Sequence, residues 1–165
     1  MLQGQIIYND IYKTQFEYAK EIVASNDHTR QDTLGKLAMN ITSYSDFDRE
    51  GNIYESMVNS GQIHLLRNQN IVTHLRIPEE RYNYTNRMES IHYDAMMTFA
   101  APNISSVIDF STQKIMSMER IYTFEFQNLL ISLLDIMQEK EQTYNAAITE
   151  IDEILVLIDE ELKPN

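Results

Sequence analysis

The clearest alternation of hydrophobic and polar positions lies near the end of the chain, between Thr123 and Leu162. This segment contains neither glycine nor proline, and at 1.5 Å per residue it predicts roughly 60 Å of α-helix. Its apolar residues form one series that repeats every seven residues, with several flanking positions: Leu130, Met137, Tyr144, Ile151 and Ile158, flanked by Leu133, Leu134, Ile148, Ile154, Leu155 and Leu162. The stripe is broader than a strict coiled-coil seam, so it predicts a helix packed inside a bundle.

Six polar residues, from Gln138 to Thr143, interrupt this apolar stripe. The interruption has two explanations at this stage. Either the helix passes through a wetter layer of the bundle, or it projects beyond its neighbours.

The same periodicity predicts further helices upstream. The first covers about Gln5 to Ser25, a second begins near Asp32 or Thr33, and a long one runs from Asn70 towards Phe99. Their candidate core positions, in that order, are Ile7, Ile11, Tyr18 and Ile22; Leu34, Leu37, Ala38 and Ile41; and Ile71, Leu75, Tyr84, Met88, Ile91 and Ala95.

Glycine and proline mark the expected boundaries. A short helix from Asn52 to Val58 should end at Gly61, which readily adopts the left-handed conformation of a helix C-terminus. Pro78 predicts a kink or a restart of the long helix, because its nitrogen donates no hydrogen bond. Loops are expected at Ser25–Asp32 and at Phe99–Ser106.

Composition supports an all-α fold. The 165 residues include only four glycines and three prolines, too few for the many tight turns of a sandwich or barrel. We therefore predict a single helical domain over residues 1–165, a helical bundle organised around the long C-terminal helix.

Charge narrows the range of partners. Twenty-five acidic and 13 basic side chains give a formal net charge of −12, which would repel nucleic-acid phosphates and anionic lipids. The chain contains no cysteine, so disulfides and thiolate chemistry are absent. No apolar run in it is long enough to cross a bilayer.

One pair of residues suggests metal chemistry. Glu89 and His92 are three residues apart in a predicted helix, so a carboxylate and an imidazole on one face could reach the same metal ion. Di-iron bundles use this spacing on two helices together with two more glutamates, and here it occurs once. The alternative is a partly exposed pair flanking the core residue Ile91.

The sequence predicts no catalytic residue and no cofactor site. It contains no Walker A loop, no dinucleotide-binding glycine pattern, no nucleophile elbow and no zinc-protease motif. Enzyme activity is therefore unsupported by any catalytic signature.

Residues Tyr54 to Asn68, read as Tyr-Glu-Ser-Met-Val-Asn-Ser-Gly-Gln-Ile-His-Leu-Leu-Arg-Asn, form a pattern of a small apolar helix followed by Ser-Gly. The chain also runs from Asn128-Leu129-Leu130 into a long helix that closes on Ile154, Leu155, Ile158 and Leu162. In both places it resembles a family of uncharacterised bacterial proteins with one N-terminal membrane-anchoring helix and a helical extracytoplasmic domain. The resemblance implies a transmembrane anchor upstream of Met1 and a location on the periplasmic or extracytoplasmic face of a bacterial membrane.

The first functional hypothesis is accordingly a membrane-tethered helical module that binds a ligand or protein, as a sensor or scaffold. Its partner would be a second copy or another protein, bound through the long C-terminal helix. Two alternatives remain open: a metal-dependent helical-bundle enzyme that uses Glu89 and His92, and a cytoplasmic protein-interaction domain.

Overall fold

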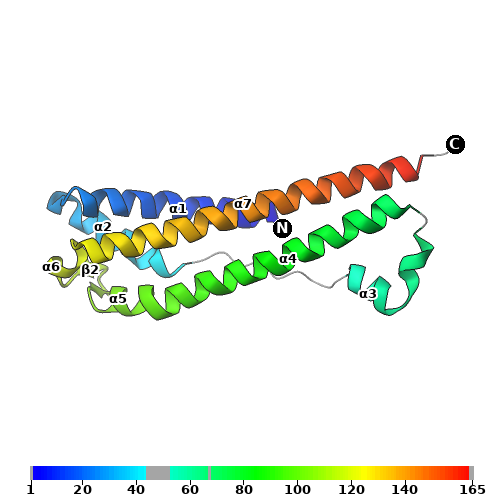
Figure 1. Cartoon of the computed structure of the whole chain (residues 1–165). Helices are drawn as coiled ribbons and strands as arrows, with labels where there is room; N and C mark the ends of the chain where they lie inside the picture. The colour runs from blue at the N-terminus through cyan, green and yellow to red at the C-terminus, as the bar shows by residue number, and fades with distance from the viewer. Residues whose placement is uncertain (1, 44–52, 67, 164–165) are drawn as a thin grey trace.

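The computed structural model describes residues 2–43, 53–66 and 68–163, and it confirms the predicted all-α bundle (Figure 1). The three longest helices are α1 (Leu2–Ala24), α4 (Gln69–Ala95) and α7 (Phe124–Glu161). The 38-residue α7 closely matches its predicted bounds. In Figure 1, α1 and α4 both run antiparallel to α7 and lie alongside it.

Shorter elements complete the chain. They are η1 (His28–Arg30), α2 (Gln31–Met39), η2 (Asn40–Thr42), α3 (Ile53–Asn59), η3 (Gln62–Leu65), η4 (Met96–Ala100), α5 (Ala101–Ser105), β1 (Ile108–Asp109), β2 (Lys114–Ile115) and α6 (Met118–Ile121). Gly61 follows α3 with φ of 69°, the left-handed conformation that the sequence predicts for it.

The two halves of α7 have different surroundings. Its first half packs against α1, and the ends of these helices meet where the Tyr122 hydroxyl donates to the Asp27 carbonyl (3.0 Å). Its second half continues beyond the start of α1 and packs against the first half of α4, as Figure 1 shows. Asn68 and Arg81 hydrogen bond to Glu161 and Glu150 along this contact. We call the pair formed by residues 69–81 and 147–161 the distal arm.

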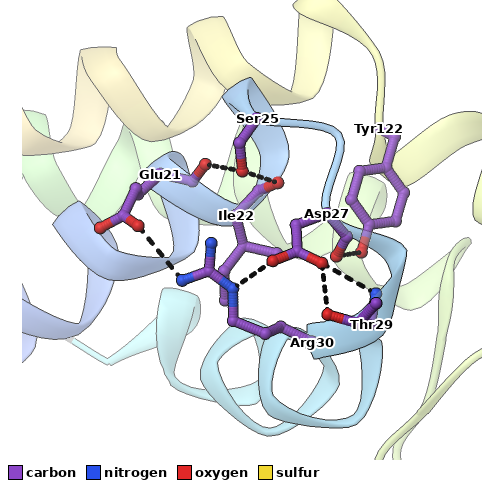
Figure 2. Close-up of polar contacts among 7 residues, drawn as sticks. All are labelled: Glu21, Ile22, Ser25, Asp27, Thr29, Arg30 and Tyr122. Atoms are coloured by element: carbon purple, nitrogen blue, oxygen red, sulfur yellow. Dashed lines mark hydrogen bonds and ion pairs between the residues drawn. The ribbon is translucent and has the colours of Figure 1, made fainter.

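The turn after α1 is held by a network around Asp27 (Figure 2). The Asp27 carboxylate accepts hydrogen bonds from the Thr29 amide and hydroxyl, and it forms an ion pair with Arg30 at 2.6 Å. Hydrogen bonds from Thr29 and then Arg30 lower the pKa of Asp27 to about 2. Arg30 also reaches Glu21 on α1, so the network fixes the angle at which the chain enters α2.

A small hairpin lies against α2, and no pattern in the sequence predicts it. Strands β1 and β2 pair antiparallel, with Ile108 opposite Ile115. Gly35 is buried in α2, and a Cβ there would lie 2.4 Å from the Gln113 carbonyl oxygen. Only glycine therefore allows the helix and the hairpin backbone to approach this closely.

The loop predicted at Phe99–Ser106 is wrong, because these residues are helical up to Ser105. The helix continues through a π-helical turn, η4, into α5, with the Ala101 amide bonded to the Met96 carbonyl. Pro102 has no amide hydrogen for the α-helical bond to the carbonyl four residues earlier, and its ring crowds that carbonyl. The wider π-helical turn that precedes it is compatible with a proline at this position. Pro78 does not restart the chain either, since α4 is one helix from Gln69 to Ala95.

The buried face of α1 differs from its prediction. Ile7, Ile11 and Tyr18 are exposed, whereas Ile22 is buried as expected. The buried residues of this helix are Asn9, Phe16, Ala19, Ile22 and Val23. Polar Asn9 belongs to this face because its side-chain amide donates to the Met137 carbonyl (2.9 Å), a contact that hydrophobic periodicity does not register.

Candidate functional site

The predicted metal pair, Glu89 and His92, lies inside the bundle. The interpretation of the two as a partly exposed pair flanking a core residue is wrong. Glu89 is 3% exposed and His92 0% exposed, whereas Ile91 is 44% exposed. The face of α4 that meets α7 is therefore rotated from the one that its hydrophobic residues predict.

The register of α4 follows from a buried face that mixes apolar and polar residues. The buried positions recur at the three- and four-residue spacing of a helix and continue into η4: Thr85, Met88, Glu89, His92 and Met96. Counting only apolar residues gives Ile91 a core position, because three of these five buried residues are polar. Partners for those polar groups must come from the helix opposite.

These partners come from the polar interruption of α7 and the residue that follows it. Lys140 and Thr143 are buried, although they lie in the predicted polar segment, and Tyr144 is buried next to them. The Tyr144 hydroxyl donates to the Glu89 carboxylate, and the Lys140 ammonium lies 3.3 Å from His92 Nδ1. At this point α7 therefore passes through a buried polar part of the bundle and does not project beyond its neighbours. We call these residues (Glu89, His92, Lys140, Thr143 and Tyr144) the polar layer.

Burial, and secondly the Lys140 ammonium, lower the pKa of His92 to about 3. The imidazole is therefore neutral at physiological pH. A neutral ring whose Nδ1 accepts from Lys140 carries its proton on Nε2. The hydrogen bond from the Lys140 ammonium thus orients the His92 ring within the bundle.

The Lys140 ammonium lies beside His92, where a metal ion bound by Glu89 and His92 would need further anionic ligands. Lys140 also lies over the Tyr144 ring, at 5.9 Å from its centroid. Within residues 2–43, 53–66 and 68–163, no three His, Asp or Glu side chains gather as a metal site would require. Metal binding by Glu89 and His92 stays a prediction, and the neighbouring ammonium opposes it electrostatically.

A second feature lies on the surface of the distal arm. Four aliphatic residues of α7 and its C-cap residue Leu162 succeed one another at alternating spacings of three and four residues: Ile148, Ile151, Leu155, Ile158 and Leu162. This alternation is the spacing of a coiled-coil seam. We call these five residues the distal seam.

The distal seam is largely uncovered. Ile151 and Leu155 are 40% and 54% exposed, Leu162 is exposed further still, and the other two residues are half-buried. The contact with α4 uses a neighbouring side of α7, where Ala147 and Ile154 are buried. The expectation that the whole stripe lies inside the bundle is therefore correct for Leu130 and Met137 and wrong for Ile151 and Leu155.

Two carboxylates border the distal seam. Asp152 and Asp159 each follow a seam residue directly, and both are exposed. In the part of the chain that the structure describes, neither carboxylate forms an ion pair. An aliphatic stripe with an acidic edge thus faces outward.

A groove of about 470 Å³ lies at the opposite end of the bundle, between η4 and the first turns of α7. Its walls are mainly apolar, with Phe99 and Ile136 among them, and Glu125 is its one ionisable residue. None of the residues of the polar layer or the distal seam reaches it.

Comparison with known proteins gives no match: no protein-family model, curated protein or solved structure is significantly similar to this chain. No helix in the described ranges is both long enough and apolar enough to cross a membrane.

Proposed function

We propose that this chain is a helical interaction module that binds a helix of another molecule along the distal seam. As the resemblance to membrane-anchored bacterial proteins implies, the module would act as a tethered scaffold or sensor on the extracytoplasmic side. Sequencing the native gene upstream of Met1 tests the tether. An upstream region with no apolar segment would contradict it.

The observation that carries the proposal is the exposed seam with its alternating spacing. A lone exposed leucine is ordinary on a protein surface, but five aliphatic residues in one line are not. Covering an exposed aliphatic side chain fully contributes about 1.5–3 kcal/mol. A single helix lying on Ile151, Leu155 and Leu162 would gain several such contributions.

The test is a binding measurement with a labelled peptide of three heptads, carrying leucine or isoleucine at the seam positions and glutamine at the flanks. We expect its fluorescence anisotropy to rise on titration with the protein. The substitution Leu155→Gln should weaken binding at least about tenfold, because it removes the central aliphatic contact.

Val156→Gln is the matched control. Val156 is 57% exposed, against 54% for Leu155, but it is turned about 100° around the helix from the seam. Equal losses in the two variants, or no binding to the unaltered protein, would contradict the proposal. Sedimentation of the protein alone reports whether a second copy occupies the seam.

A further inference from the structure

We infer that the helix bound by the distal seam is basic: it presents lysine or arginine beside its aliphatic residues and lies in line with α1. This inference rests on the proposed function and specifies the partner. Two observations carry it, the continuity of the seam with the α1 interface and the charges along its edge.

The distal seam continues an interface that already exists within the chain. Its two heptad positions extend back along α7 without a change of spacing, through Tyr144, Glu141, Met137, Leu134 and Leu130. In the first half of α7 the apolar members of this line are buried, and α1 packs against that half. The line becomes exposed where α7 passes the start of α1 (Figure 1). A helix on the distal seam would therefore occupy the position that α1 occupies along the first half.

The α1 interface also shows which charge suits this side of α7. Lys13 of α1 forms an ion pair with Glu141 of α7 at 2.8 Å, and both side chains are partly buried. Glu141 interrupts the aliphatic line, and the covering helix supplies the cation that balances it.

Beyond α1, the same edge of α7 remains acidic. Asp152 and Asp159 follow Glu141 by 11 and 18 residues, close to three and five helical turns, so the three carboxylates line up. Glu141 has its lysine, whereas the two aspartates form no ion pair within the described residues. A covering helix with basic flanks would supply the missing cations.

Charge also disfavours a second copy of this chain as the occupant. In an antiparallel pairing of two distal seams, Asp152 of one copy would face Asp159 of the other. Each copy also carries a formal net charge of −12. Like charges placed opposite one another weaken such a pairing and favour a partner of opposite sign.

The experiment compares three heptad peptides that share one aliphatic seam and differ only in their flanks, which are lysine, glutamine or glutamate. Each is titrated with the full chain at low and at high salt. We expect the lysine peptide to bind roughly tenfold tighter than the glutamine peptide at low salt, and the glutamate peptide to bind weakest. The advantage of lysine should shrink as salt screens it.

Two double variants locate the effect. Asp152→Asn with Asp159→Asn should remove most of the advantage of the lysine peptide over the glutamine peptide. Glu153→Gln with Glu160→Gln removes the same charge from the other side of α7, and it should retain the advantage.

The outcomes separate the inference from the proposed function. Equal binding of the lysine and glutamine peptides, or equal losses in the two double variants, would overturn the basic partner and leave helix binding intact. A homodimer that Leu155→Gln dissociates would also overturn it, because the occupant would then be a second copy. If the protein binds none of the three peptides and sediments as a monomer, the proposed function itself is contradicted.

Discussion

Gly35 illustrates how a single residue can serve a contact that local propensity does not register. Glycine within a helix costs stability relative to alanine, so its position in α2 looks unfavourable from sequence. The hairpin backbone at Gln113 approaches it so closely that a Cβ would clash with a carbonyl oxygen. The benefit of glycine here comes from packing between two segments distant in the chain.

We therefore expect Gly35→Ala to lower the free energy of unfolding by about 1–3 kcal/mol, since the helix and hairpin must move apart. Urea denaturation followed by circular dichroism measures the change. Gly4→Ala is the control, because a Cβ at Gly4 meets nothing within 4 Å, and it should stabilise α1 by about 0.5–1 kcal/mol. A neutral result at both positions would show that the contact at Gly35 is not limiting.

His92 should make stability depend on pH. Its pKa is about 3 in the folded chain, below the ordinary value of 6.5, so the unfolded state binds the extra proton between these values. Stability should then be complete above pH 6.5 and fall as the pH drops below it, by at most about 1.4 kcal/mol per pH unit. Urea denaturation between pH 7 and pH 5 tests this.

The comparison variant is His92→Gln, which cannot titrate. Its stability should vary less over the same pH range than that of the unaltered chain. This range also avoids Asp27, whose pKa of about 2 confines its contribution to more acidic conditions, between about pH 4 and pH 2. Identical pH slopes for the two proteins would rule out a neutral buried His92.

At the scale of elements, α7 is one continuous helix in two environments. Its first half packs against both α1 and α4, whereas its second half depends on α4 and leaves the distal seam in water. Helical hydrogen bonding is the same in both halves, but the packing that resists local opening is not.

Hydrogen exchange should reveal this difference. Amides of residues 149–161 should exchange on the order of tenfold faster than those of residues 126–140, because local opening there breaks fewer tertiary contacts. Mass spectrometry of exchanged peptides measures both halves in one experiment. Uniform protection along α7 would mean that the distal arm is as stable as the rest of the bundle.

The same division explains what could be predicted from sequence. The existence of the long helices, and most of their bounds, follow from periodicity and from the lack of glycine and proline. Rotation of the helices was predicted less well, because Asn9, Thr85, Glu89 and His92 are buried polar residues and Ile7, Ile11 and Ile91 are exposed. Burial of a polar group depends on a partner from another helix, and a single segment of sequence does not contain that partner.

For the candidate sites too, the sequence predicts the residues, whereas their contacts and exposure depend on how the helices are arranged. The six-residue interruption of the stripe predicts either a wetter layer or a projecting helix, and the spacing of Glu89 and His92 marks them as a pair. Their contacts with Tyr144 and Lys140 depend on the arrangement of α4 and α7, which the sequence pattern does not contain. The residues of the distal seam all belong to the apolar stripe that the sequence shows. Their exposure depends on where α1 begins relative to α7, which is a property of the assembled chain.

On the scale of the whole molecule, α7 is the common support. The hairpin, α2 and the Asp27 network lie at the end where α7 begins, and the distal arm extends from the other end (Figure 1). A protein built this way keeps a well-packed body at one end and presents the largely uncovered distal seam at the other. The proposed binding surface thus lies at the end of the molecule away from the hairpin.

The polar layer has a consequence for how α4 and α7 align. Aliphatic residues on α7 recur every seven residues, so a shift of α4 along α7 by two helical turns would still bury aliphatic side chains. Such a shift would place the Glu89 carboxylate and the His92 ring opposite apolar side chains near Met137 or Ile151. These buried polar groups would then lack hydrogen-bond partners on α7. We therefore expect the polar layer to select one axial register of α4 against α7 from several that hydrophobic contacts alone would allow.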